Sequence, residues 1–198
     1  MKNILCFGDS LTAGYYNEGN DFHPYSEKLA ELTGTHIDHI GLSGFTADEM
    51  IDNTNNSYIE DYVNKKWTGL SVQLKKKEYD LCIILAGTND ISDGDGSVTI
   101  TADILKLHSI AGSHGCNTVA LTIPRIKFES ADNTITKLRE QINRNLINNA
   151  ELFSKNEYRV IDLAAELGDN YEYMDDDGLH FKPEGYDEIA RIISTYLK

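Results

Sequence analysis

Five short apolar runs, separated by longer amphipathic stretches, constrain the fold of this chain more than any other feature of its sequence. The runs are rich in Ile, Leu, Val and Cys, and we interpret them as β-strands. They cover residues 3–7, 36–42, 81–87, 117–123 and 158–163. Helices are expected at about 22–33, 46–53, 97–113, 134–155 and 183–197. The last of them begins at Pro183, a residue favoured in the first turn of a helix.

Strands that alternate with helices along a chain pair in parallel and are joined by right-handed crossovers. The pattern therefore predicts an α/β fold, a three-layer α/β/α sandwich around a five-stranded parallel sheet. With 198 residues, the chain is expected to form a single domain over 1–198. In such sheets the functional residues lie on loops at the carboxyl ends of the strands. Candidate site residues are therefore expected in those loops.

The charge of the chain excludes several classes of partner. A formal net charge of -14 and a pI near 4.7 repel nucleic acid and anionic membrane surfaces. Lys75, Lys76 and Lys77 form the only dense basic run, which is typical of a solvated helix end. The sequence contains no apolar run of 18 residues and no signal-peptide pattern, so we expect a cytoplasmic protein without integral membrane association.

The three cysteines, Cys6, Cys82 and Cys116, lack the spacing of a metal site. Cys6 and Cys82 lie within apolar runs, where a thiol ordinarily behaves as a small buried hydrophobic group. We therefore expect structural thiols and no bound metal.

The loop after the first predicted strand, FGDSLTAGY, places Ser10 where a strand passes into a helix. A serine hydroxyl there can face the crevice, close to the positive end of the helix. Ser10 is also suited to cap the helix, since Ser and Asp are both preferred at that position. The loop is not a G-x-S-x-G nucleophile elbow, because Thr12 replaces the second glycine, and this disfavours an ordinary α/β-hydrolase. It also lacks the G-x-x-x-x-G-K-[ST] and G-x-G-x-x-G motifs that bind phosphate.

Two further loops belong to the same predicted edge of the sheet. GLSGFTADE, after the second strand, has two glycines within four residues. This suggests a turn with positive φ or a close backbone approach, so the N–H of Gly44 could donate to a ligand. LAGTND, after the third strand, could present the amide of Asn89 to the crevice, although asparagine is also a common turn residue.

The segment YMDDDGLHFKPEGY pairs an acid with a histidine before the last helix. Asp177 and His180, three residues apart, can lie on one side of a single turn. The carboxylate then holds one ring nitrogen and leaves the other free as a base. A calcium loop is disfavoured, because Tyr173 occupies the first ligand position and Pro183 precedes the last.

Together these loops resemble the sequence blocks of the SGNH hydrolase superfamily, also called GDSL lipases and esterases. The blocks occur in family order as GDSLTAG, GLSGFT, GTND and DGLH, and they cover the chain from Ser10 to His180. The resemblance implies a flavodoxin-like fold, with Ser10 as nucleophile, His180 as general base and then acid, and Asp177 orienting His180. It implies an oxyanion hole formed by the N–H groups of Ser10 and Gly44 and the side-chain amide of Asn89.

The resemblance also implies hydrolysis of acyl esters through an acyl-serine, without a metal or an organic cofactor. Family members act on acetylated sugars, thioesters, lysophospholipids, aryl esters and short lipid esters. The acidic chain favours a small soluble ester with a short or acetyl acyl group. A lysophospholipase or a thioesterase of the same family is the alternative. A non-hydrolytic flavodoxin-like module that binds phosphate or flavin is an alternative of another class, but it leaves Asn89, Asp177 and His180 without roles.

One position departs from the family pattern. His39 stands where members often carry an asparagine, five residues before the second-block glycine. We expect a hydrogen-bonded core or loop histidine there, with a role as an alternative base less favoured.

Two segments are expected to shape the substrate pocket. One is PRIKFESADN, residues 124–133, in which we interpret Arg125 as a surface charge rather than as a contact for an anionic substrate. The other is the long connection 52–78, which carries Tyr58, Tyr62 and Trp67. We expect it to be a partly helical excursion over the edge or top of the sheet, as a lid or an interface. The sequence does not indicate an oligomeric state.

Overall fold

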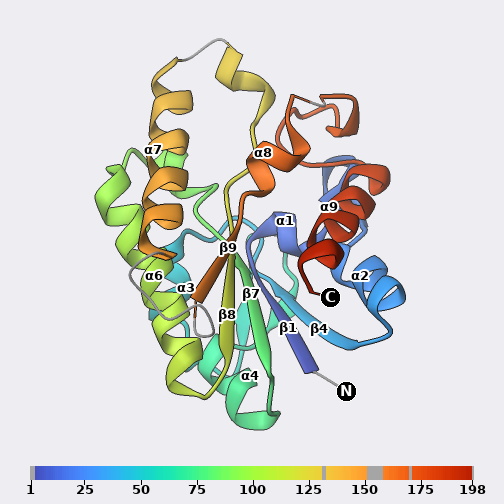
Figure 1. Ribbon diagram of the computed structural model, residues 1–198, viewed down its shortest axis with the longest axis vertical. Coiled ribbons are helices and arrows are strands. Elements are labelled where there is room, and N and C mark those ends of the chain that lie inside the picture. The colour runs from blue at the N-terminus through green and yellow to red at the C-terminus, as the bar shows by residue number, and fades with distance from the viewer. Residues whose placement is uncertain (1–2, 131–132, 151–157, 170, 198) are drawn as a thin grey trace.

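A parallel sheet of five strands forms the centre of the protein (Figure 1), as the apolar runs predict. The computed structural model describes residues 3–130, 133–150, 158–169 and 171–197. The strands of the sheet are β1 (Asn3–Gly8), β4 (His36–Gly41), β7 (Leu81–Leu85), β8 (Asn117–Leu121) and β9 (Tyr158–Ile161). Their spatial order, β4-β1-β7-β8-β9, is the flavodoxin-like order 2-1-3-4-5. The order reverses next to β1, so the residues that follow β1 lie at the switch point of the sheet.

Helices cover both faces of the sheet and make the expected three layers (Figure 1). One face carries α2 (Tyr25–Thr33), α8 (Leu163–Leu167) and α9 (Pro183–Tyr196). The other carries α3 (Ala47–Asp52), α4 (Leu70–Lys76), α6 (Ser97–Ser113) and α7 (Asn133–Ala150).

The side chains of β1 point alternately into two hydrophobic cores, one on each face of the sheet. Ile4 and Cys6 pack with α2 and α9, whereas Leu5 and Phe7 pack with the helices of the opposite face. Successive side chains of a strand point to opposite faces, and here both faces are apolar because helices cover both. Cys82 and Cys116 are buried as well, and none of the three thiols forms a disulfide. Burial raises the pKa of the Cys6 thiol to about 12.

Several short elements were not predicted. They are α1 (Ser10–Ala13), α5 (Asp90–Asp93), α8, and the two-residue strands β2 (Tyr15–Tyr16) and β3 (Asp21–Phe22). Single turns of 3-10 helix occupy Asn17–Gly19, Lys127–Ser130 and Tyr171–Tyr173. Elements this short span little more than one helical or strand period, so hydrophobic periodicity cannot reveal them.

One predicted helix boundary differs clearly from the observed one, and another falls outside the described residues. The helix expected from residue 22 begins at Tyr25 after Pro24, because residues 21–22 pair with β2 instead. The helix expected over 134–155 is α7, which is described to Ala150, and residues 151–157 lie outside the described residues.

The long connection 52–78 is partly helical, as expected. It contains a small hairpin, β5 (Ile59–Glu60) paired with β6 (Lys66–Trp67), followed by α4. Lys75 and Lys76 lie in the last turn of α4, in agreement with a solvated basic helix end. Within the part of the chain that the structure describes, no helix is long and apolar enough to cross a membrane.

Candidate active site

The strands β1, β4 and β7 end side by side, next to the switch point, and a loop follows each of them. In the strand register, Gly8 pairs with Gly41 of β4 and with Leu85 of β7. The loops that begin after these residues carry Ser10, Gly44 and Asn89. The carboxyl edge of the sheet thus brings together three of the residues that the sequence singled out.

Ser10 is the first residue of α1 rather than its cap. Asp9 is the N-cap, and its Oδ1 accepts a hydrogen bond from the N–H of Leu11 at 2.9 Å. Ser10 is only 6% exposed. The N–H groups in the first turn of a helix have no acceptor within the helix, so the backbone N–H of Ser10 stays available beside its own hydroxyl.

Ser10, His180 and Asp177 form a continuous chain of hydrogen bonds. The Oγ of Ser10 lies 2.8 Å from Nε2 of His180, across 170 residues of sequence. The Nδ1 of His180 lies 2.6 Å from Oδ2 of Asp177. Each ring nitrogen of the histidine therefore has one partner, the serine hydroxyl on one side and the carboxylate on the other.

The turn that contains Asp177 and His180 fixes this geometry. Oδ1 of Asp177 accepts from the N–H groups of Leu179 and His180, both at 2.9 Å. Partial burial acts to raise the pKa of Asp177, but its hydrogen bonds from His180 and Leu179 outweigh burial and lower the pKa below its usual value. Asp177 is therefore an anion at neutral pH. The ring of Tyr15 packs on the imidazole of His180, with centroids 4.2 Å apart.

The turn at residues 42–45 has the shape that its glycines suggested. The N–H of Phe45 donates to the carbonyl oxygen of Leu42 at 3.1 Å, and Gly44 has a φ of 85°. A Cβ added at Gly44 would lie 2.4 Å from Cδ2 of Tyr62. Only glycine combines this left-handed backbone with the close approach of the ring. In the described part of the chain, the N–H of Gly44 has no backbone acceptor.

Asn89 is attached to the same turn. Its Nδ2 donates to the carbonyl oxygen of Phe45 at 2.8 Å. An amide nitrogen carries two hydrogens, so one of them is left for a further acceptor.

Asp90, the next residue, was not predicted as part of the site. Both of its carboxylate oxygens accept from the N–H of Ala47, at 3.0 and 3.1 Å, and the residue is 2% exposed. Burial raises the pKa of Asp90 to about 6. The GTND block contained it, but nothing in that block shows a bond to a helix 43 residues away.

Asp9 is the second buried carboxyl beside the serine. It is fully buried, and desolvation raises its pKa to about 7, although the hydrogen bond from the N–H of Leu11 acts in the opposite direction. An acid therefore titrates near neutral pH next to Ser10.

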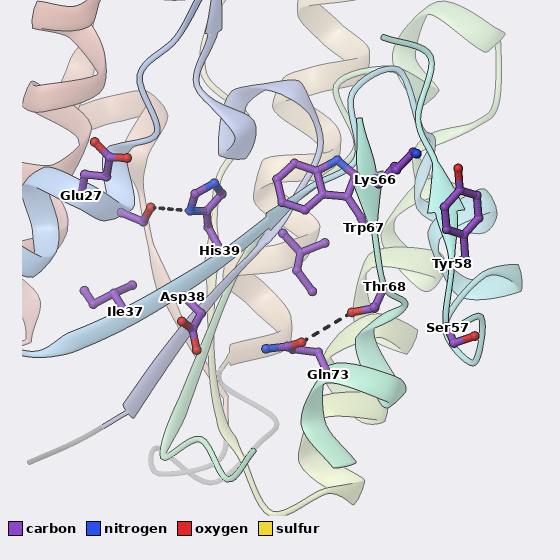
Figure 2. Close-up of a pocket in the computed structure, with 12 residues that line it drawn as sticks. Glu27, Ile37, Asp38, His39, Ser57, Tyr58, Lys66, Trp67, Thr68 and Gln73 are labelled. Atoms are coloured by element: carbon purple, nitrogen blue, oxygen red, sulfur yellow. Dashed lines mark hydrogen bonds between the residues drawn. The ribbon is translucent and has the colours of Figure 1, made fainter. Parts of the chain in front are cut away.

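His39 lies apart from these residues, in a groove of about 690 Å³ along the edge strand β4 (Figure 2). Its Nδ1 is 3.1 Å from Oγ of Ser26, and its ring meets Trp67 edge to face. Burial lowers the pKa of His39. The structure therefore connects His39 with Ser26 and not with Ser10, in agreement with a hydrogen-bonded loop or core histidine.

The aromatic residues of 52–78 divide between the groove and the turn. Tyr58 and Trp67 line the groove, whereas the ring of Tyr62 covers Gly44 and meets Phe45 edge to face. The three aromatic residues of this segment thus belong to two surfaces, the groove beside β4 and the turn at residues 42–45.

The other predicted pocket segment touches the histidine turn. The N–H of Lys127 donates to the carbonyl oxygen of Gly178 at 2.8 Å. Arg125 forms an ion pair with Asp169 at the surface, as a surface charge would. Residues 131–132 of this segment lie outside the described residues.

The described residues contain no group of three or more His, Cys, Asp or Glu side chains suited to hold a metal ion. The hydrogen-bonded serine, histidine and aspartate, with free N–H donors nearby, form an arrangement that can activate a hydroxyl and stabilise an oxyanion.

Comparison with protein families gives one match: the GDSL-like lipase/acylhydrolase family matches residues 6–188. Among curated proteins, none matches the sequence.

Solved structures share the fold over nearly the whole chain. A lipase/acylhydrolase from Enterococcus faecalis is similar with a TM-score of 0.73 and 20% identity, covering 100% of this chain and 95% of that one. An acetyl esterase variant bound to acetate has a TM-score of 0.72 and 16% identity, with coverage of 100% and 96%. A family 3 carbohydrate esterase from Clostridium thermocellum has a TM-score of 0.68 and 17% identity, with coverage of 99% and 98%.

Proposed function

The chain belongs to the GDSL-like lipase/acylhydrolase family, the SGNH hydrolases, which are ester hydrolases, and we propose that it cleaves carboxylic esters through an acyl-serine at Ser10. The observation that carries the proposal is the chain of hydrogen bonds from Ser10 through His180 to Asp177. A weakly acidic hydroxyl becomes a nucleophile when a positioned base takes its proton.

In the acylation step, Oγ of Ser10 attacks the ester carbonyl carbon and its proton passes to Nε2 of His180, 2.8 Å away. Asp177 holds the ring with Nδ1–H directed toward it and stabilises the imidazolium that forms. The negative charge on the former carbonyl oxygen is met by the N–H groups of Ser10 and Gly44 and by Nδ2 of Asn89.

The intermediate then collapses. The bond to the alkoxy oxygen breaks, and His180 transfers its proton to the leaving alcohol. A water molecule next gives its proton to His180 and attacks the acyl-serine. Breakdown of the second intermediate releases the carboxylic acid and restores the Ser10 hydroxyl.

The proposed substrate is a small soluble ester with a short acyl group, such as acetyl. A net charge of -14 opposes contact with anionic bilayers. Two of the similar structures are named as an acetyl esterase and a carbohydrate esterase, which supports this choice. A lysophospholipase or thioesterase activity remains the alternative within the family.

The test is hydrolysis of p-nitrophenyl esters from acetate to decanoate by the wild-type protein and Ser10→Ala. We expect the highest kcat/KM on acetate or butyrate and a loss of at least about 10⁴-fold in Ser10→Ala. An optimum at decanoate would favour a lipid ester, and faster cleavage of a matched acetyl thioester would favour a thioesterase. Equal rates for the variant and the wild type would refute Ser10 as the nucleophile. Absence of any ester cleavage would favour a non-hydrolytic binding module.

A further inference from the structure

The hairpin β5–β6 holds the turn that carries Gly44. The backbone N–H of Tyr62, at the tip of this hairpin, donates to the carbonyl oxygen of Ser43 at 3.2 Å. In a trans peptide the C=O and the N–H point to opposite sides. This bond therefore directs the N–H of Gly44, which belongs to the same peptide, away from the hairpin.

Asp61 ties the hairpin to Ser43 at a second point. Its carboxylate is 4% exposed and accepts four hydrogen bonds. Oδ1 accepts from the N–H groups of Val63 at 3.1 Å and Lys65 at 2.8 Å. Oδ2 accepts from the N–H of Ser43 at 3.2 Å and from Nε1 of Trp67 at 2.9 Å. A buried carboxylate is tolerated when its oxygens are hydrogen-bonded. Here three of the bonds stay within the hairpin, and the bond from Ser43 crosses to the turn.

Ser43 is thus held through both of its backbone polar groups, the N–H by Asp61 and the C=O by Tyr62. The peptide between Ser43 and Gly44 must keep its direction if the N–H of Gly44 is to meet an oxyanion. A flip of that peptide would place a carbonyl oxygen there instead, and its partial negative charge would oppose the reaction. Glycine leaves such a flip sterically accessible. The bond from Tyr62 holds this peptide directly through its C=O, and the bond to Asp61 holds the preceding peptide through the N–H of Ser43.

We propose that Asp61 is a positioning residue for the esterase reaction, which fixes the direction of the Gly44 N–H through Ser43. The inference rests on the proposed function, because it concerns a donor of the same oxyanion hole. Asp61 does not contact the reacting atoms. Its loss weakens an interaction made in the transition state, so it lowers kcat more than it changes KM.

The main test is Asp61→Asn, which preserves the size of the side chain. The amide oxygen can still accept from Val63 and Lys65, but the amide NH₂ then faces the N–H donors of Ser43 and Trp67. With p-nitrophenyl acetate we expect kcat to fall about 10- to 100-fold, while KM changes by less than about threefold. We expect the pH dependence of kcat to keep its wild-type shape, because Ser10, His180 and Asp177 are untouched.

Asp38→Asn is the matched control. The Asp38 carboxylate also accepts several hydrogen bonds, from Lys77 at 2.7 Å and Tyr79 at 2.6 Å, and lines the groove that contains His39. Within the described residues, none of its hydrogen bonds reaches residues 42–45. We expect kcat within about twofold of wild type, since surface carboxylates contribute little beyond local stability.

Trp67→Phe is the second control, because it removes one donor to Asp61 and leaves the bond to Ser43. We expect its kcat within about threefold of wild type. Figure 2 shows the Trp67 indole beside His39, with its ring nitrogen directed away from Gln73. Trp67 is the only tryptophan of the sequence, so the tryptophan fluorescence of Asp61→Asn reports the surroundings of this indole, whose bond to Asp61 the substitution alters.

Two outcomes would overturn the proposal: a wild-type kcat in Asp61→Asn, or an equal loss of kcat in Asp38→Asn. If Asp61→Asn does not fold, Asp61→Ser replaces it, since a serine hydroxyl can accept from the hairpin N–H groups but is too short to reach Ser43. The same fall in kcat is expected there, and a wild-type kcat refutes the role.

Wild-type protein and Ser10→Ala are measured alongside. Absence of hydrolysis by the wild type would refute the proposed function itself, whereas normal wild-type hydrolysis with an unaffected Asp61 variant would refute only this inference.

Discussion

The two sides of the proposed active site are held in place by different kinds of contact. On the relay side, Ser10, His180 and Asp177 touch one another directly, and two of them belong to a single turn. On the oxyanion side, Gly44 offers only a backbone N–H, and its neighbours are held from distant segments: Asp61 bonds to Ser43 across 18 residues, and Asp90 bonds to Ala47 at the start of α3 across 43 residues. Replacing one atom can therefore break the chain of hydrogen bonds from Ser10 to Asp177. The oxyanion side is supported by several contacts, so loss of one of them should lower activity only in part.

The pKa values of the carboxyl groups also differ between the two sides. Hydrogen bonds lower the pKa of Asp177 on the relay side, so its charge is constant over the neutral range. Near the oxyanion side, burial raises the pKa of Asp9 to about 7 and that of Asp90 to about 6. Asp177 is therefore a constant anion next to His180. Asp9 and Asp90 can gain or lose a proton close to the place where the oxyanion would form.

The largest effect expected from a conservative change is that of Asp177→Asn. The amide oxygen can still accept from Leu179 and His180, so the turn is preserved, but the amide favours the wrong tautomer of the histidine. We expect kcat on p-nitrophenyl acetate to fall about 10³- to 10⁴-fold with an unchanged circular dichroism spectrum. A fall of less than tenfold would show that the relay does not depend on this carboxylate.

Asn89→Ala tests the side-chain donor of the proposed oxyanion hole. Removal of one such donor typically lowers kcat by about 10²- to 10³-fold, and we expect this with KM nearly unchanged. Loss of the bond to Phe45 should also reduce the free energy of unfolding by about 1 kcal/mol. A kcat equal to that of wild type would contradict the role of Asn89.

Gly44→Ala tests whether the shape of the turn matters apart from its hydrogen bonds. The added Cβ meets the ring of Tyr62 at 2.4 Å, and the φ of 85° is unfavourable for alanine. We expect about 1 to 3 kcal/mol of destabilisation and a kcat about tenfold lower. In a double-mutant cycle, Tyr62→Ala should recover part of the stability by removing the clash. Strict additivity of the two substitutions would show that the ring yields without cost.

The smallest effect concerns the pH dependence of stability through Asp9. Its pKa is raised from 3.8 to about 7 in the folded protein. Folding therefore takes up a proton between these values. The stability that this group contributes is complete below about pH 4 and is lost as the pH rises through 7. Asp9→Asn keeps an acceptor for Leu11 but cannot ionise.

We therefore expect Asp9→Asn to gain stability relative to wild type between pH 5 and pH 8, on the order of 1 kcal/mol. Thermal unfolding at both pH values measures this. Asp90 titrates in both proteins, so its contribution largely cancels in the comparison. A stability difference that does not vary with pH would contradict a raised pKa at Asp9.

The sequence predicted the sheet and the edge at which the candidate residues meet, for a physical reason. A buried parallel strand is a continuous apolar run, and residues that follow such runs share one edge, so Ser10, Gly44 and Asn89 could be assigned to it. The spacing of Asp177 and His180 is local and is visible as a pattern.

The supports of the oxyanion side could not be predicted in this way. Asp61 lies in a hairpin whose strands have two residues each, too short for alternation to show. Its bond to Ser43, like that of Asp90 to Ala47, joins segments that only the folded sheet brings together. An acidic residue that is buried by such contacts looks like any solvated acid in the sequence.

The 170 residues between Ser10 and His180 have a consequence for the growing polypeptide. Translation supplies the serine first, then the glycine turn and Asn89, and the histidine only after β9 has been made. A nascent chain can therefore complete the oxyanion side while its nucleophile still lacks a base. In the course of its own synthesis the protein should remain inert toward cellular esters, and activity should arise in one step when the last helix docks.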